Sequence, residues 1–278
     1  MSTPATIPTS LFQFAFCKYL NRTNPSLNKE FSDFINNELY PMIIPENWGT
    51  PNGGKQYPVL ENYIHHTFQR IAYEYNEAIS PFDKQKKVMT IGNNACFNTG
   101  LFTSGYEKIY AYFQKNNVPN KQPWYLIGFL RESDVRLSQF DPLPERARYF
   151  DDPGELIFDY RCPIRSNKQH ILVDNRSRLP HEYQTDEKYE TLVRQFDGAV
   201  AEIEKKLSAN YKFAVPQYYQ NKMQLLIPLC FTGNTPELAL AIEKQGAVYI
   251  ARTCLTLDMA YNNARLIVKP ETDWLRAV

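Results

Sequence analysis

The chain has 278 residues and a formal net charge of +1, with 31 Lys and Arg against 30 Asp and Glu. This balance excludes a global electrostatic field that would recruit nucleic acid or an anionic membrane, so any polyanion must bind a local patch. The length allows one large domain or two small ones, each with a real hydrophobic core. The high aromatic content, 19 Tyr and 17 Phe, favours β structure with half-buried rings.

The five cysteines are widely spaced, and most have apolar neighbours. This odd number indicates buried free thiols in a reducing cytoplasm rather than a disulfide framework. No C-x-x-C pair occurs and the four histidines lack zinc-ligand spacing, so we expect no structural zinc. The apolar run 11–16 is too short for a signal sequence or a membrane span. We therefore expect a cytoplasmic protein without a membrane partner.

The N-terminal part of the chain is predicted to be helical. Residues 1–10 are small and polar, which is typical of a flexible tail. Apolar residues then recur at helical spacing in three segments, 11–20, 27–39 and 59–78. Glycine and proline breakers in 45–58 predict a loop.

From residue 87 onward, short apolar runs rich in aromatic and β-branched residues predict strands. These runs are 88–91, 108–113, 124–130, 156–160, 169–173 and 223–231. A long amphipathic helix is predicted over 189–208. No linker separates the helical segment 11–86 from the sheet-containing core 87–278, so we predict a single domain over 11–278.

The C-terminal part has the pattern of a strand, a helix and a strand. Thr235 fits a helix N-cap, Pro236 the first helical position and Gly246 the helix end. A predicted strand over 247–257 follows directly, and this βαβ-like order favours a partly parallel sheet. The segment 258–268 fits a hairpin or a short helix equally well. The expected fold is α/β, with α+β as the alternative: a mixed sheet with flanking helices and no internal repeat visible in the sequence.

A polar, glycine-containing stretch between apolar runs stands out within 91–113. Asn94, Asn98 and Thr99 lie close to Gly100 in this stretch. It is either a tight structural turn or a surface that presents amides and backbone N–H groups to a ligand. On the second interpretation, these three side chains are candidate ligand-binding residues. No phosphate-loop lysine pattern accompanies them.

Arginine is concentrated in one window, since eight of the fourteen arginines lie within residues 131–178. The planar guanidinium binds phosphate at two points and stacks on rings. Six aspartates share the window, and a solvated face of mutual ion pairs is the default explanation for most of these charges.

Two apolar runs of this window end in an acid followed by an arginine, Asp159 with Arg161 and Asp174 with Arg176. If both runs are neighbouring strands, the four side chains converge at one edge of the sheet, and His170 shares a face with Asp174. Carboxylates beside His and Arg suit metal-assisted or general-base hydrolysis of a phosphoester. The alternative is a strand-end salt bridge with an Asx turn at 174–175.

The candidate roles are therefore as follows. The candidate catalytic residues are Asp159, Asp174 and His170, and both aspartates are also candidate ligands for Mg²⁺ or Mn²⁺. The candidate phosphate-binding residues are Arg161, Arg165 and Arg176. We further predict that Asn98 lies near Asp174 and Arg176 in one shared pocket.

Three fragments, FNTGLFTSGYEKIYAYF, NKQHILVDNRSRLP and ARTCLTLDMAYNNARLI, resemble the family known as domain of unknown function 3825. The resemblance runs from about Val59 onward and is most specific at Asn98–Leu101. It implies an RNA-related role, because members in bacteria and some eukaryotes are often joined to RNA-binding modules, and it implies no catalytic residue. The first 58 residues do not resemble such a module, so a free nucleotide is a rival ligand to RNA.

Three functions follow from these patterns. The first is an RNA- or nucleotide-handling protein that acts as a metal-assisted phosphoesterase or an RNA-end processing enzyme. The second is a non-catalytic RNA-binding module, and the third is a protein-interaction module.

Overall fold

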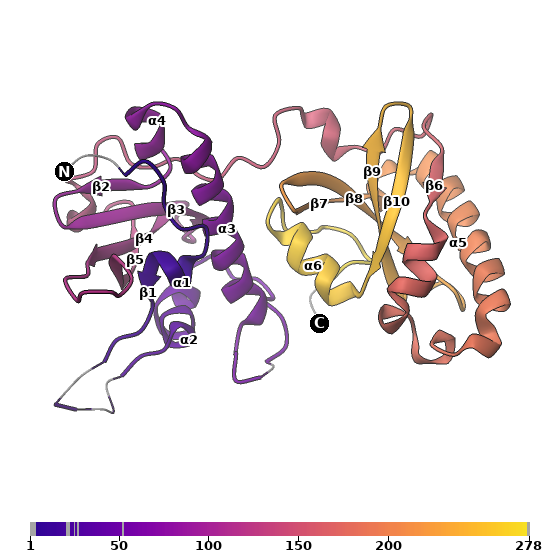
Figure 1. The fold of residues 1–278 in the computed structure, drawn as a ribbon, viewed down its shortest axis with the longest axis horizontal. Coiled ribbons are helices and arrows are strands. Elements are labelled where there is room, and N and C mark those ends of the chain that lie inside the picture. The colour runs from indigo at the N-terminus through magenta and orange to yellow at the C-terminus, as the bar shows by residue number, and fades with distance from the viewer. Residues whose placement is uncertain (1–3, 21–22, 25, 27, 52, 277–278) are drawn as a thin grey trace. The chain divides into compact units, whose positions relative to one another are not determined.

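The computed structural model describes residues 4–20, 23–24, 26, 28–51 and 53–276. The chain divides into two compact units, Met1–Arg148 (unit 1) and Tyr149–Val278 (unit 2), where the sequence led us to expect one domain (Figure 1). Each unit holds a mixed five-stranded sheet with flanking helices. The prediction of an α/β or α+β fold with mixed sheets is confirmed.

Unit 1 is built on a sheet of strand order β1-β5-β4-β3-β2, in which β2 to β5 form an antiparallel meander and β1 lies parallel to β5. Its strands are β1 (Ala15–Phe16), β2 (Met89–Ile91), β3 (Asn94–Phe102), β4 (Lys108–Lys115) and β5 (Trp124–Arg131). Its helices are α1 (Leu11–Phe14), α2 (Phe31–Phe34), α3 (Pro58–Glu77) and α4 (Pro81–Gln85), with a π-helical turn over Ile35–Leu39 and 3-10 turns over Tyr40–Met42 and Val135–Leu137.

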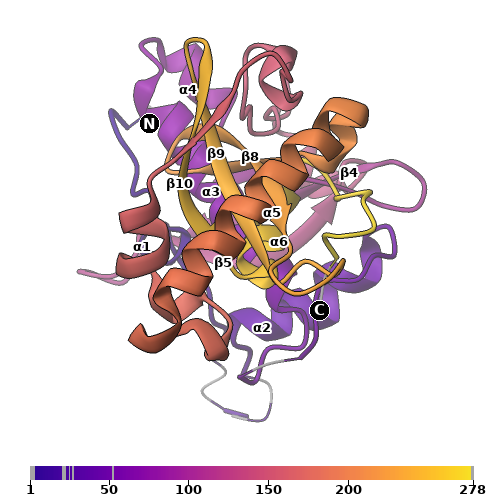
Figure 2. The same cartoon turned by 90° about the vertical axis from the view of Figure 1, so that its right-hand side faces the viewer.

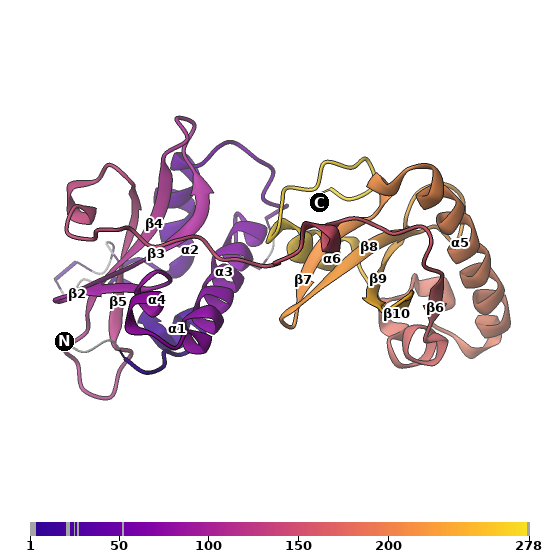
Figure 3. The ribbon, with the colours of Figure 1, turned by 90° about the horizontal axis from the view of Figure 1, so that it is seen from above.

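The long helix α3 covers one face of this sheet (Figure 3). Phe68 of α3 packs at 5.3 Å from Phe97 of β3, measured between ring centroids, and Phe97 stacks on Phe113 of β4. The opposite face buries Tyr112 against Phe140 from the segment that follows β5. Because both faces are covered, the strands read as nearly continuous apolar runs.

The N-terminal predictions are only partly confirmed. The helix expected over 59–78 is α3, but the one expected over 11–20 ends at Phe14, because residues 15–16 join the sheet as β1. The predicted tail begins with residues 1–3, which lie outside the described residues. The part from Pro4 to Ile7 is anchored: Tyr75 Oη donates to Pro4 O, and Ile7 N donates to Asn76 Oδ1.

Unit 2 has the strand order β6-β10-β9-β8-β7, in which β7 to β10 form an antiparallel meander and β6 lies parallel to β10. Its strands are β6 (Ile164–Ser166), β7 (Val215–Tyr219), β8 (Lys222–Leu229), β9 (Leu238–Gln245) and β10 (Val248–Leu255). Its helices are α5 (Tyr189–Ala209) and α6 (Leu257–Arg265), with a π-helical turn over Gln169–Asp174 and 3-10 turns over Pro153–Leu156, Arg176–Arg178, His181–Tyr183, Asp186–Lys188 and Tyr211–Phe213.

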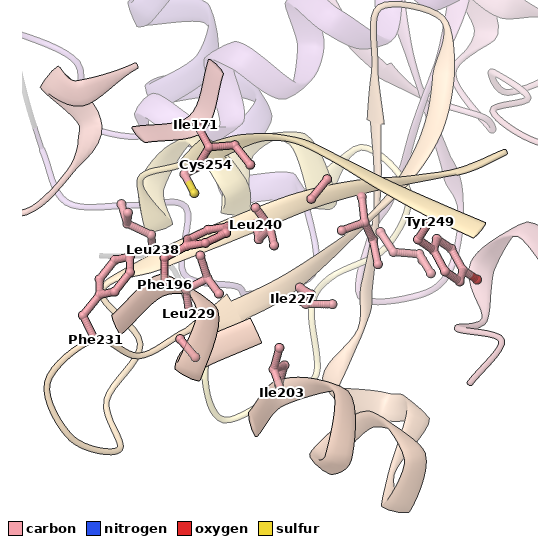
Figure 4. Close-up of a cluster of buried hydrophobic side chains, with 14 of the residues drawn as sticks. Ile171, Phe196, Ile203, Ile227, Leu229, Phe231, Leu238, Leu240, Tyr249 and Cys254 are labelled. Atoms are coloured by element: carbon pink, nitrogen blue, oxygen red, sulfur yellow. The ribbon is translucent and has the colours of Figure 1, made fainter. Parts of the chain in front are cut away.

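Helix α5 crosses one face of this sheet, as Figure 2 shows, and α6 covers part of the other face. The core of unit 2 lies beneath α5, where Phe196 and Ile203 of the helix meet Ile227 of β8 and Leu240 of β9 (Figure 4). Burial of this apolar face, at roughly 25 cal/mol per Å² removed from water, is what fixes α5 on the sheet.

The predicted βαβ-like C-terminal unit is wrong in its central element, because the segment expected to be a helix is strand β9. Leu238, Leu240 and Ile242 of β9 face α5, while Ala239 and Ala241 are buried on the other face. A strand buried on both faces shows no alternation and reads like a buried helix. Gly246, at φ +60°, closes the β9–β10 hairpin instead of ending a helix.

Two other predicted strands are also wrong. The segment 156–160 is the end of a 3-10 turn and a loop, and 169–173 lies in the π-helical turn. The ambiguous segment 258–268 contains helix α6, whose N-cap Thr256 accepts a hydrogen bond from Met259 N through its side chain. The predicted strands at 88–91, 108–113, 124–130 and 223–231 and the helix at 189–208 are confirmed.

The two units share one topology, although the sequence shows no repeat. In each unit a short strand precedes a long helix, α3 or α5, and a four-stranded meander follows. The short first strand then pairs in parallel with the last strand of the meander. The architecture is therefore a strand–helix–meander arrangement that occurs twice along the chain.

Candidate functional site

Two of the predicted catalytic residues are in contact in unit 2. His170 and Asp174 lie four residues apart on the π-helical turn, and His170 Nδ1 is 3.0 Å from Asp174 Oδ2. Asn175 completes the cluster, with its Nδ2 atom 3.2 Å from His170 Nε2. Both ring nitrogens of His170 are therefore hydrogen-bonded, and the side chain is about half exposed to solvent.

The hydrogen bonds favour one tautomer of the imidazole. Asn175 Nδ2 also lies 2.7 Å from the main-chain oxygen of His170, which only accepts, so this atom is the amide nitrogen and acts as a donor. His170 Nε2 must then accept from Asn175, and Nδ1 carries the proton that Asp174 accepts. An imidazole oriented in this way by a carboxylate has its basic lone pair on Nε2, as a general base requires.

The segment that carries this cluster is fixed to the body of unit 2. Arg178 Nη1 donates to Thr253 Oγ1 at 2.8 Å and to the main-chain oxygen of Cys254 at 3.0 Å, at the end of β10. At the other end of the segment, Lys168 pairs with Asp197 of α5. Arg176, one of the predicted phosphate ligands, places its guanidinium 5.9 Å from the ring centre of Tyr189.

Asp159 belongs to a different cluster. Its carboxylate accepts hydrogen bonds from Arg161 at 2.8 Å and from Lys244 of β9 at 3.0 Å. These two cations hold the pKa of Asp159 well below its ordinary value. The main-chain N–H of Asp159 donates to Tyr249 Oη, so the cluster lies beside the β9–β10 hairpin. A carboxylate neutralised by two cations is a weak base, and this geometry gives it the role of an ion-pair centre.

The prediction that Asp159 and Asp174 converge required segments 156–160 and 169–173 to be neighbouring strands. Neither segment is a strand. Asp159 precedes β6 and Asp174 follows it, and among the residues that the structure describes the two carboxylates share no hydrogen-bond partner. Arg165 lies between them on β6, exposed and opposite Ile250. Within the described residues, no three His, Cys, Asp or Glu side chains are grouped so that they could hold a metal ion.

The polar stretch around Asn98 is an internal feature of unit 1. Asn98 and Thr99 are buried in β3, where Asn98 Oδ1 accepts from Gly100 N and its Nδ2 donates to the main-chain oxygen of Pro144. Thr99 Oγ1 donates to the main-chain oxygen of Ile109. The Thr99 bond joins β3 to β4 where their register is irregular, and Gly100 takes φ +76° there.

Asn94 binds internally as well, accepting from Tyr112 Oη at 2.8 Å and donating to Gln139 at 3.0 Å. The stretch is not a tight turn, because all three residues belong to strand β3, and their side chains bind other residues of unit 1. The pocket predicted from Asn98, Asp174 and Arg176 would combine residues of two different units, so neither unit contains it whole.

Sequence reasoning missed two partners of the predicted residues. Asn175 entered only in the alternative interpretation, as part of an Asx turn, although its position beside Asp174 was a usable signal. Lys244, which neutralises Asp159, lies 85 residues away from it along the chain and carries no local signal. The sequence placed His170 and Asp174 on one face of a predicted strand, but they lie on a π-helical turn. Their contact was still expected, because a spacing of four aligns side chains on a helix as well as on a strand.

Comparisons with known proteins place the chain by family alone. No curated protein and no solved structure matches it significantly. None of the described helices combines the length and apolarity needed to cross a membrane. The sequence model of the family described as "Domain of unknown function (DUF3825)" matches residues 39–274, which is most of both units. The chain therefore belongs to the DUF3825 family.

Proposed function

We propose that this protein handles RNA or nucleotides and cleaves a phosphoester bond with His170 as the general base. The observation that supports the proposal is the hydrogen bond from His170 Nδ1 to Asp174, which places the basic lone pair of the imidazole on Nε2. Arg176 and Arg165, in the same part of the chain, supply cations for a phosphate. RNA and free nucleotides share that phosphate chemistry.

In the proposed step, Nε2 takes a proton from a hydroxyl nucleophile, which is a water molecule or a ribose 2′-hydroxyl. The nucleophile's oxygen bonds to phosphorus, and the leaving oxygen departs with a proton from solvent. Asp174 stabilises the imidazolium that forms on His170. Asn175 must release Nε2 before the step, because its amide occupies that atom. The proposed step uses His170 as the base and assigns no role to a metal ion.

The test is one incubation of the protein with a short RNA and a nucleotide panel, in Mg²⁺ or Mn²⁺ and then in EDTA. Turnover that disappears in His170→Ala and persists in EDTA supports the general-base proposal. Turnover that requires metal and survives in His170→Ala assigns the chemistry to another site. Absence of turnover in the wild-type protein under all conditions contradicts an enzymatic role.

A non-catalytic RNA-binding module is the second candidate function, and the Asn175 contact favours it. An amide that occupies His170 Nε2 blocks the base in the resting state. Tyr160 is 69% exposed beside the exposed Arg161, an arrangement suited to stacking on a base. This candidate predicts RNA binding that weakens with salt, persists in EDTA and gives no cleaved product.

We place the protein in the cytoplasm as part of this proposal. All five cysteines are free thiols, and four of them are buried. Unpaired cysteines are typical of a reducing compartment. The localisation is tested by fractionating cells that express the chain at its natural level.

A further inference from the structure

Unit 2 contains a cavity that the proposed phosphoester chemistry does not use. It lies between the second half of α5, the end of β8 and the C-terminal segment, and its volume is about 330 Å³. None of the residues around His170 or Asp159 lines it. Its size is at the lower end of the range for small-molecule sites, which suits one ring system and its substituents but not a polymer segment.

Four of the residues that line the cavity contribute flat apolar surfaces. Trp274 and Phe213 contribute aromatic rings, and Pro228 and Pro236 contribute aliphatic rings. The only polar atom of the indole is already satisfied, because Trp274 Nε1 donates to the main-chain oxygen of Phe213 at 2.9 Å. The indole therefore offers its carbon surface to an occupant, and aromatic surfaces of this kind favour stacking with planar rings.

The polar groups at the cavity are neutral or already paired. Lys206 forms an ion pair with Glu202, and Asp273 forms one with Arg276. The side chains of Asn234 and Thr235 also line the cavity, and no hydrogen bond to another described residue engages either one. A charged occupant would thus lack a free counter-charge, whereas a neutral ring with polar edge atoms finds an amide and a hydroxyl.

We propose that this cavity binds a neutral, planar aromatic compound of the size of a nucleobase or nucleoside. The proposal uses none of the residues of the His170 cluster, so it holds or fails independently of the phosphoester chemistry. A nucleoside and a simple aromatic compound share the required ring chemistry. Adenosine and indole, used as separate probes, distinguish a nucleoside ligand from a simple aromatic one.

Cys230 provides a reporter, because it lines the cavity and is the one cysteine of the five that is not buried. Burial raises the pKa of Cys17 and of Cys254 to about 12, so these thiols react slowly in the folded protein. Burial also raises the pKa of Cys230, but this thiol is the accessible one, so we expect it to react first with a disulfide reagent, and Cys230→Ser removes that reaction. A bound ring covers this thiol and slows its reaction at least fivefold.

The experiment combines thiol kinetics with calorimetry on the full chain, in separate titrations with adenosine and indole. Trp274→Ala is expected to weaken binding about tenfold, because stacking of a base on an aromatic ring contributes about 1–3 kcal/mol. Tyr211→Ala, which removes a half-exposed ring that does not line the cavity, is expected to leave affinity unchanged. Circular dichroism and thermal melting establish that both variants are folded.

Each outcome decides the proposal. Binding of adenosine that is weakened by Trp274→Ala assigns a nucleoside site, and binding of indole alone with the same dependence assigns a site for a ring without ribose. No heat and no protection of Cys230 with either probe at millimolar concentration overturns the proposal. Binding that Trp274→Ala does not weaken also overturns it, because the probe is then bound elsewhere.

Discussion

His170 and Asp174 are joined by a 3.0 Å hydrogen bond across one turn of a π-helical segment. The π-type turn is rare, and single turns of this kind are frequent at functional sites. Here the turn is held at both ends. Arg178 donates a hydrogen bond to Thr253 of β10, and Lys168 forms an ion pair with Asp197 of α5. The imidazole thus has a fixed tautomer on a tethered segment, and this relationship makes the first prediction specific.

Asp174→Asn is expected to lower phosphoester turnover by about 100-fold or more, because a neutral amide no longer stabilises the imidazolium. The measurement is the cleavage rate of a short RNA together with the NMR signals of the His170 ring, which report its tautomer. Asp197→Asn is the matched control, since it removes an acid that pairs with the same segment through Lys168. Equal losses in both variants would assign the effect to the tether and not to His170.

Gly100→Ala is expected to destabilise unit 1 for two reasons. The residue has φ +76°, and a Cβ atom there would lie 2.7 Å from Tyr63 Oη. The backbone term is about 1–2 kcal/mol, and the clash adds to it. Gly92→Ala supplies the control, because φ is +56° there and nothing lies within 4 Å of the added carbon. Urea unfolding that gives the same loss for both variants would show that the Tyr63 contact imposes no cost.

Asn98→Ala is expected to lower the free energy of unfolding by about 1–3 kcal/mol, because it leaves Pro144 O and Gly100 N without their amide partner. Asn94→Ala removes an amide that is less buried and is expected to cost less. Denaturant titration of both variants measures the difference. If Asn98→Ala keeps full stability but loses ligand binding, the ligand-binding interpretation of this residue is supported over the structural one.

The Asp159 ion pairs predict a pH dependence of stability in unit 2. Arg161 and Lys244 lower the pKa of Asp159 in the folded state below its ordinary value of 3.8. A carboxylate whose pKa is lower in the folded than in the unfolded state stabilises the fold at pH values above its unfolded-state pKa. This stabilisation is lost as the pH falls towards the pKa in the folded state. The melting temperature of the wild type should exceed that of Asp159→Asn at pH 7, and the gap should shrink below about pH 4. A gap that widens on acidification contradicts this sign.

Much of the candidate site was visible in the sequence, but its grouping was not. The acid, the histidine and the arginines were found because their residue types suit phosphate chemistry, and His170 meets Asp174 as their spacing requires. The second cation beside Asp159, Lys244, comes from β9, which follows the long helix α5 along the chain, and no local pattern indicates it. The buried amide of Asn98 looked like an exposed ligand group because sequence alone does not report burial.

By itself the sequence determined the elements with a strong local period, α3 and α5, and the strands with alternating or aromatic-rich runs, because a periodic apolar face specifies a single element. Only the tertiary structure decided that the segment from 238 to 245 is a strand, since burial on both faces removes the period that separates strand from helix. It also decided the parallel pairing of β1 with β5 and of β6 with β10. Those pairings join strands that are distant in sequence. Their hydrogen bonds can form only after the rest of the unit has folded and brought the edge strand of the meander beside the short first strand.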